Sequence, residues 1–308
     1  MPTMNVIASI LIKASPEKIY PIISNLNHWE TWSPWVLAEP GAAVTVAKDG
    51  KYHEWTGEII GSGNLKVVDE VENKSVSMDL NFLKPWRSFA KTTFVLTPRK
   101  EGTLVKWTME SRLAFFLFWM KKQMEIFVSM DYNRGLLLLK DLIETGATNS
   151  TLSFKGSKPF YATKYVGIKT SCPFSEIGNH MERDFTELMQ YLMQNYRELL
   201  TGNGLSIYHK TEVVKDRVVY TAAHPVSEIP KNLPEHFVVD ELPKFNAYTI
   251  RHTGPYRHIG NAWAAGMMHQ RSKKFKATRA IPPIEVMYNS PTNTPEKELI
   301  SEILFPVR

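Results

Sequence analysis

Two stretches of the sequence, 82 positions apart, repeat one another, and this repeat limits the allowed folds more than any other feature. Residues 173–179 (PFSEIGN) and 255–261 (PYRHIGN) share a Pro-aromatic pair and an Ile-Gly-Asn triplet at the same spacing. The two copies close on Pro225-Val226 and Pro306-Val307, at an offset of 81. A duplicated unit buries its apolar surface against its own copy, so the second half of the chain is expected to fold as two related units side by side.

Each copy is predicted to contain a strand, a turn at the Pro-aromatic pair, a helix that opens near the Ile-Gly-Asn triplet, and two further strands. In the first copy, residues 184–200 show helical spacing with one apolar face, formed by Phe185, Leu188, Met189, Leu192 and Tyr196. The helix of the second copy is expected over residues 262 to about 274, with Trp263, Gly266 and Met267 on one face. Together the two units would form one antiparallel sheet with both helices on one surface and a groove near the pseudo-twofold axis.

The first half of the chain has the pattern of an antiparallel sheet closed by a long helix. Residues 4–13 alternate apolar and polar, and a short or bent helix is predicted to follow, because Pro16 suits a first turn and Pro21 interrupts the helix. Residues 45–112 alternate with period two between turn signals, which is typical of a strand meander with one wet face. Spacings of three and four residues then predict an amphipathic helix that ends near Gly146.

The length of the chain, 308 residues, exceeds what one hydrophobic core usually serves. Residues 147–157 are small and polar, as is typical of a linker. The predicted domains are therefore residues 1–146 and residues 158–308. The predicted fold class is α+β: an antiparallel sheet wrapped around its long C-terminal helix, followed by the duplicated strand-helix-strand-strand domain.

The single cysteine, Cys172, excludes an internal disulfide and a paired-cysteine zinc site, and it suits a reducing, cytoplasmic compartment. No metal and no cofactor is expected. Residues 113–120 form the most membrane-like run, which is far shorter than the roughly 20 residues of a spanning helix. We interpret this run as a buried strand end or helix start, so no membrane insertion is expected.

Part of the net charge of +6 comes from a basic stretch that has no acidic member, formed by Arg271, Lys273, Lys274, Lys276 and Arg279. Such a stretch can contact phosphate groups. No DNA-reading helix pair and no series of stacking aromatic residues accompanies it. A solvated loop after a helix is therefore the favoured interpretation, and direct DNA binding is not expected.

Four motifs of the first half, in a fixed order, match a known superfamily: residues 14–19, the tryptophan-rich residues 27–35 (NHWETWSPW), residues 102–107 (GTLVKW) and residues 135–140. With them, nearly all of residues 1–146 resembles the SRPBCC superfamily, in particular its polyketide-cyclase-like, START-related branch. The resemblance implies a helix-grip fold that holds an apolar ligand between the sheet and the long helix. The candidate pocket residues are Trp29, Trp32, Trp35 and Trp107; the alternative is that they pack the helix against the sheet.

The second half carries a longer ordered set of motifs. It runs from residues 252–256 (HTGPY), with Gly260 and Trp263, through residues 282–286 (PPIEV) to the end of the chain. With these motifs, residues 158–308 resemble the GyrI-like domain, which is also the effector-binding module of some AraC- and MerR-type regulators. The resemblance implies a bacterial protein that binds lipophilic, often cationic molecules with aromatic walls and a carboxylate.

Glu285 occupies the acidic strand position of that family, inside the apolar run 284–287, and is the leading candidate ligand contact. A carboxylate in an apolar groove is costly unless a cation or a strong donor meets it, so a cationic aromatic ligand is a natural partner. The alternative places Glu285 on the wet face of its strand or beside a base. Tyr256, Trp263 and Met287 are the other candidate wall residues.

Met287 departs from the family's pattern, which commonly has a tyrosine two residues after the glutamate. Methionine keeps an adaptable apolar wall but cannot donate a hydrogen bond or move a proton. This substitution weakens the hydrolase activity that some relatives are thought to have. A tyrosine from elsewhere in the domain would have to replace it, and the candidates are Tyr165, Tyr208, Tyr248 and Tyr256.

Three functions are compatible with the sequence. The first, which we favour, is a binding protein with a lipophilic small-molecule pocket in each domain, acting in sensing or sequestration. The second is a hydrolase or cyclase of small hydrophobic substrates with Glu285 as acid or base. The third is an inhibitor-like protein that docks on a protein partner through its basic edge or a terminal strand. No nucleophile, base and orienting group are arranged together in the sequence, which favours the binding protein and leaves enzymatic activity an open alternative.

Overall fold

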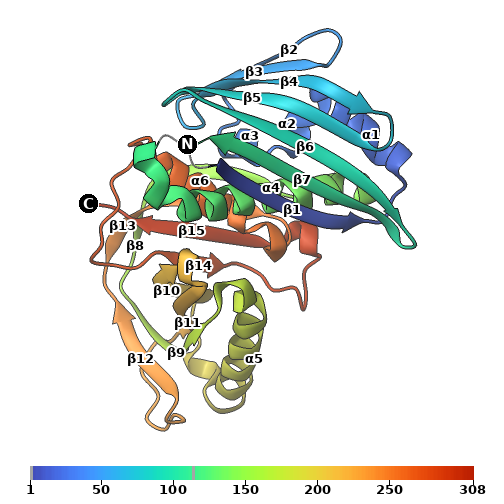
Figure 1. The fold of residues 1–308 in the computed structure, drawn as a ribbon. Coiled ribbons are helices and arrows are strands. Elements are labelled where there is room, and N and C mark those ends of the chain that lie inside the picture. Colours follow the sequence, from blue (N-terminus) through green and yellow to red (C-terminus); the bar gives the residue numbers. More distant parts are fainter. Residues whose placement is uncertain (1–2, 113–114) are drawn as a thin grey trace. The chain divides into compact units, whose positions relative to one another are not determined.

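A computed structural model of the chain describes all residues except 1, 2, 113 and 114. The residues contact one another mainly within two compact units, one with residues 1–150 and 267–272 and the other with residues 151–266 and 273–308. Both units combine antiparallel sheets with helices (Figure 1), which confirms the predicted α+β class.

The first unit contains a seven-stranded antiparallel sheet in the order β1-β7-β6-β5-β4-β3-β2. The long helix α4 (Lys121–Thr145) runs along the inner face of this curved sheet (Figure 1), which is the predicted helix-grip arrangement. The strands are β1 (Thr3–Ile12), β2 (Ala43–Val46), β3 (Tyr52–Thr56), β4 (Ser62–Val71), β5 (Ser75–Lys84), β6 (Ser88–Arg99) and β7 (Gly102–Arg112).

Short helices connect β1 to β2. The first, α1 (Pro16–Ser24), begins at Pro16 and contains Pro21, as expected. It is followed by η1 (Leu26–His28), α2 (Trp29–Trp32) and α3 (Pro34–Ala38). Helix α4 ends at Thr145 and is capped by Gly146, whose φ of 82° is the left-handed conformation that glycine adopts most easily.

The core of the first unit follows the predicted alternation. Val76 and Met78 of β5, and Val105, Trp107 and Met109 of β7, are all buried between sheet and helix. Residues 113–120 were predicted to be a buried strand end or helix start. Residues 113 and 114 lie outside the described residues, and Phe115–Met120 form a 3-10 turn, η2, directly before α4. The expected burial was wrong for Phe118 and Trp119, which are exposed.

The second unit contains an eight-stranded antiparallel sheet in the order β12-β9-β11-β10-β14-β15-β13-β8. Its strands are β8 (Thr151–Phe160), β9 (Thr163–Cys172), β10 (Gly204–Glu212), β11 (Arg217–Pro225), β12 (Phe237–Leu242), β13 (Phe245–Thr253), β14 (Ile284–Met287) and β15 (Ile300–Pro306). Its helices are α5 (Ile177–Asn195) and α6 (Gly260–Arg271), with the short turns η3 (Phe174–Glu176), η4 (Arg197–Leu199), η5 (Val213–Lys215), η6 (Tyr256–His258) and η7 (Glu296–Glu298).

The strand order is symmetric about the β10-β14 pair, as the repeat predicts, but each copy has one strand more than expected. The first strand of each copy pairs with the other copy: β8 with β13, and β12 with β9. Phe160 of β8 lies opposite Phe245 of β13. Their counterparts at the 82-residue offset, Leu242 of β12 and Thr163 of β9, also lie opposite each other, so the two strand pairs are equivalent. Strand β8 covers most of the segment predicted as a linker, residues 147–157. Its small polar residues and Pro159 suit the edge of a sheet.

Both predicted helices of the repeat are present with shifted ends. Helix α5 ends at Asn195 rather than at Leu200, and Leu188 and Leu192 lie on its buried face. Asp184 is also buried on this helix, because its carboxylate accepts hydrogen bonds from Thr170 (2.5 Å) and Tyr220 (2.7 Å). In α6, Gly266 is buried but Met267 is 45% exposed, so the expected common face of these two residues was wrong.

The basic stretch follows α6. Lys273, Lys274, Lys276 and Arg279 are exposed in the segment between α6 and β14. Within the described part of the chain, no helix is long and apolar enough to cross a membrane.

Candidate functional site

Glu285 lies in the middle of the second unit's sheet, on β14. It is directly opposite Ser206 of β10, and these two strands flank the pseudo-twofold axis. Its neighbours Ile284 and Val286 join the apolar cluster on one face of the sheet, so Glu285 points to the other face. Only 5% of its surface is exposed.

Side chains from both copies surround this carboxylate. The hydroxyl of Tyr208, on β10, donates a hydrogen bond to Glu285 Oε2 at 3.2 Å. The Tyr208 ring meets the Trp263 ring of α6 at 4.6 Å and an angle of 64°. Met181 of α5 approaches from the first copy, with its sulfur 3.8 Å from Ser206 Oγ and 4.0 Å from the Tyr208 hydroxyl. The glutamate therefore sits among residues of both helices and both central strands.

Burial dominates the electrostatics of this cluster. It raises the pKa of Glu285 above its ordinary value, although the hydrogen bond from Tyr208 opposes the shift. Burial and the nearby carboxylate raise the pKa of Tyr208 well above its ordinary value, and the same two causes raise the pKa of Tyr256 to about 12. Both phenols are therefore neutral donors, and the ionised glutamate is the costly group in the cluster.

Tyr208 stands at the position in the first copy that corresponds to Met287 in the second. Strands β10 and β14 correspond at an offset of 79, as judged from their pairing with β11 and β15. This offset relates Ser206 to Glu285 and Tyr208 to Met287. The phenol that the second copy lacks beside its glutamate is thus present in the first copy, and the pseudo-symmetry brings it to the same carboxylate.

The other candidate tyrosines lie elsewhere or hold structural contacts. Tyr165 belongs to the apolar cluster on the opposite face of the sheet. Tyr248 stacks on Phe275 with ring centroids 4.4 Å apart. The Tyr256 hydroxyl donates to the backbone carbonyl of Asn289 at 3.1 Å. Of these three tyrosines, Tyr256 has a pKa that Glu285 helps to raise, as Glu285 also does for Tyr208.

The tryptophans of the first unit pack on one another in its core. Trp29, Trp32 and Trp107 are 8%, 0% and 1% exposed. Trp107 stacks on Tyr132 of α4 with centroids 3.7 Å apart, and its indole N–H donates to Thr92 Oγ1 at 2.7 Å. Trp35 adds an edge-to-face contact with Tyr132 at 6.4 Å. Sequence reasoning missed Thr92 and Tyr132, because period-two alternation marks a polar inward residue such as Thr92 as outward-facing.

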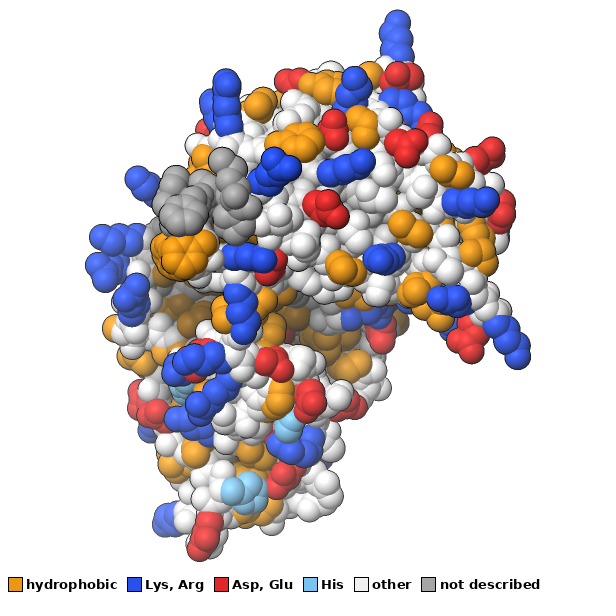
Figure 2. Space-filling view, in the orientation of Figure 1, with side chains coloured by type: hydrophobic (Ala, Val, Ile, Leu, Met, Phe, Trp, Pro, Cys, Tyr) orange, Lys and Arg blue, Asp and Glu red, His pale blue; other side chains and the backbone are white. Residues whose placement is uncertain are grey.

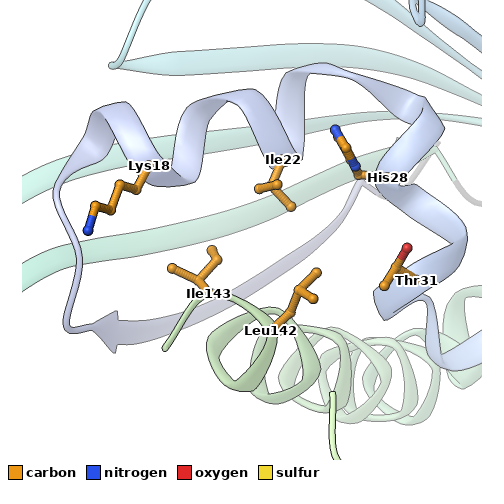
Figure 3. Close-up of a pocket in the computed structure, with 6 residues that line it drawn as sticks. All are labelled: Lys18, Ile22, His28, Thr31, Leu142 and Ile143. Carbon is orange, nitrogen blue, oxygen red and sulfur yellow. The ribbon is translucent and has the colours of Figure 1, made fainter. Parts of the chain in front are cut away.

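A cavity of about 290 Å³ opens in the first unit away from this tryptophan cluster. Ile22 of α1 faces Leu142 and Ile143 at the end of α4, and Lys18, His28 and Thr31 lie around them (Figure 3). None of these residues was a candidate from the sequence. The apolar centre and polar rim would suit a small amphiphilic molecule.

His53 and Glu54, two neighbouring titratable residues of β3, do not form an acid–base pair. His53 is buried and Glu54 is exposed, because neighbours in a strand point to opposite faces. Among residues 3–112 and 115–308, no group of three or more His, Cys, Asp or Glu side chains is arranged to hold a metal ion.

Two family models match the chain, one in each half. Residues 158–308 match the GyrI-like small molecule binding domain, and residues 3–144 match the polyketide cyclase / dehydrase and lipid transport family. Both matches support small-molecule binding. A search of curated proteins finds no match.

Several solved structures are similar at low identity. The EcmrR–DNA complex seen by cryo-electron microscopy is 20% identical over 62% of this chain and 69% of that chain, with a TM-score of 0.43. The crystal structure of the EcmrR C-terminal domain is 20% identical over 52% of this chain and 98% of that chain, with a TM-score of 0.40. The Aha1 dimer from Colwellia psychrerythraea is 23% identical over 46% of this chain and 97% of that chain, with a TM-score of 0.35.

Proposed function

Because the chain joins a polyketide-cyclase-like domain to a GyrI-like small molecule binding domain, we propose that it is a cytoplasmic protein that senses or sequesters lipophilic small molecules, and that its second unit prefers cationic aromatic ones. The observation that carries the proposal is the buried Glu285 carboxylate, which accepts a hydrogen bond from Tyr208, whose ring contacts the ring of Trp263.

The energetics of Glu285 favour a cationic ligand. In the free protein, the ionised carboxylate has lost most of its water and has only neutral donors as partners. A bound cation would meet that charge directly, and the faces of Tyr208 and Trp263 would add cation–π attraction. Trp263 is only half-buried, so we expect it to move aside when a ligand enters.

The first unit would bind an uncharged or amphiphilic apolar molecule. Two places are available for it: the tryptophan cluster, whose rings would have to separate, and the cavity beside Ile22, which is already open. A site that needs no repacking costs less to occupy, so we favour the cavity. We propose no direct contact with DNA, since the described residues of the two units form no recognised DNA-reading element.

A second candidate function is hydrolysis of a small reactive compound at the same site in the second unit. The 3.2 Å contact between Tyr208 and Glu285 favours it, because a carboxyl with a raised pKa beside a phenol can accept and return a proton. Glu285 would act as general base or acid, and Tyr208 would donate a hydrogen bond to the substrate.

The test compares two probes on the full chain by isothermal titration calorimetry. One is an N-methylquinolinium dye, which is a permanent cation, and the other is its neutral quinoline counterpart at a pH where it is unprotonated. The proposal expects tighter binding of the cation. Equal affinity for the two probes, or binding of neither, would contradict it. Turnover of p-nitrophenyl esters that is lost in Glu285→Gln would instead support the hydrolase.

A further inference from the structure

One end of the first unit's sheet exposes several large apolar side chains. Around the turn between β5 and β6, Leu83 is 42% exposed, Trp86 63% and Phe89 53%. Most exposed apolar residues elsewhere on the chain are single aliphatic side chains, which are normal on a protein surface. Two or more aromatic residues exposed together are unusual and indicate an interaction surface.

Two further aromatic residues leave the sheet at the same end. The last residues of β7 pair with the first residues of β6, and the Ser111 hydroxyl donates to the Phe89 carbonyl at 2.7 Å. In the chain, η2 is the next described element after β7, and in it Phe118 is 61% exposed and Trp119 is 68% exposed. We name this set the aromatic edge: Leu83, Trp86, Phe89, Phe118 and Trp119.

Basic residues accompany the aromatic edge. Lys84 and Arg87 lie in the same turn, Arg112 ends β7 and Lys122 begins α4, and all four are exposed. The acidic residues of these segments are fewer: Glu110 is exposed on β7, and Glu125 accepts from the backbone N–H of Asn5 and lies 3.8 Å from Lys121. Figure 2 shows basic, acidic and hydrophobic side chains interspersed on the surface of the first unit.

This combination fits a lipid surface better than a protein. Tryptophan rings are stabilised at the level of lipid headgroups, where their apolar body and polar N–H are both accommodated. Exposed lysine and arginine beside them are attracted by anionic headgroups, whereas lysine is depleted in protein–protein interfaces. Rings and charges of this kind bind at the membrane surface, so the proposed contact is peripheral.

We propose that the aromatic edge docks the first unit on membranes that contain anionic lipids. The rings of Trp86 and Trp119 insert among the headgroups, and Lys84, Arg87, Arg112 and Lys122 contact the negative surface. This activity goes beyond the proposed ligand binding and uses none of the residues at Glu285.

The experiment is co-sedimentation of the full chain with vesicles of phosphatidylcholine alone and with vesicles that contain about 30% phosphatidylglycerol. We expect binding to the anionic vesicles that is at least tenfold stronger than to the neutral ones and that weakens as salt is raised. The double variant Trp86→Ala/Trp119→Ala should lose at least tenfold in vesicle affinity, and Lys84→Glu/Arg87→Glu should lose the preference for anionic vesicles.

Two matched controls separate this surface from general effects. Tyr161→Ala removes an aromatic ring that is 68% exposed in the second unit, and Arg99→Glu/Lys100→Glu reverses two exposed charges at the opposite end of β6. Both should bind vesicles as the parent does, and unchanged thermal melting of the edge variants verifies their folding. The proposal fails if the parent does not bind anionic vesicles, or if edge and control variants bind alike. It also fails if the edge variants change only a monomer–dimer equilibrium measured by analytical ultracentrifugation, which would assign the edge to a second copy of the chain.

Discussion

The Tyr208 hydroxyl donates to Glu285 at 3.2 Å although the two residues belong to different copies of the internal repeat. Tyr208 corresponds by pseudo-symmetry to Met287, two residues after Glu285 on the same strand face. One copy therefore supplies the carboxylate and the other the phenol, and the site exists only because β10 and β14 pair across the axis.

Glu285→Gln is predicted to weaken binding of the cationic quinolinium dye roughly tenfold to a hundredfold, which corresponds to about 1–3 kcal/mol for the loss of a charge-assisted contact. The substitution keeps the shape of the side chain and removes its charge. Calorimetric titration of the full chain measures the effect. Glu298→Gln is the matched control, because Glu298 is exposed in the same unit; if both variants bind as the parent does, Glu285 does not recognise the cation.

The affinity for the cationic quinolinium dye is predicted to keep rising with pH beyond the pH range in which an exposed glutamate ionises. Burial raises the pKa of Glu285, so the free folded protein keeps this proton at a pH where an exposed glutamate has lost it. The cation requires the ionised carboxylate, so the affinity for the dye increases as pH rises through the raised pKa of Glu285. Over the same pH interval, the free protein loses the stability that the protonated carboxyl contributes. A pH series of titrations measures this. Glu285→Gln should show no such rise, and an identical rise in that variant would assign the titration to another group.

Thr92→Val is predicted to destabilise the first unit by about 1–3 kcal/mol, although the two side chains have similar shapes. Thr92 Oγ1 accepts from the Trp107 indole N–H at 2.7 Å and lies 3.1 Å from the Tyr132 hydroxyl, and all three groups are buried. Valine leaves these groups without their partner. Urea unfolding followed by tryptophan fluorescence measures the change, and Thr97→Val, on the same strand and half-buried, should stay within about 0.5 kcal/mol of the parent.

Cutting the chain before β8 is predicted to give a stable second domain, whereas cutting within β8 is predicted to destabilise that domain. A fragment of residues 147–308 keeps all eight strands of its sheet, whereas a fragment of residues 158–308 loses most of β8, which pairs with β13 along its length. The shorter fragment should melt several degrees lower, since a loss of about 1 kcal/mol lowers Tm by roughly 2–8 °C in domains of this size. Equal melting temperatures would show that β8 contributes little, and failure of the longer fragment to melt cooperatively would reject two independent domains.

Local patterns in the sequence were sufficient for much of this architecture. Period-two alternation located the strands of the first unit, and three- and four-residue spacing located α4 up to Gly146. The repeat predicted a symmetric second sheet. Glu285 was singled out by the resemblance to the GyrI-like domain together with the apolar run around it. These features could be predicted because burial of one face of a strand or helix leaves its period in the residue order.

Other features depended on partners far away in the chain. Strands β8 and β12 carry weak local signals, because each is completed by a strand of the opposite copy. Asp184 is buried on an otherwise apolar helix face only because Thr170 and Tyr220 satisfy its carboxylate. Among four candidate tyrosines, the sequence could not choose the one that reaches Glu285, whereas the paired register of β10 and β14 places Tyr208 there and Tyr165 on the opposite face. The period of a strand determines that a side chain faces inward, but the register with its neighbours, which is set by long-range packing, determines which group it meets.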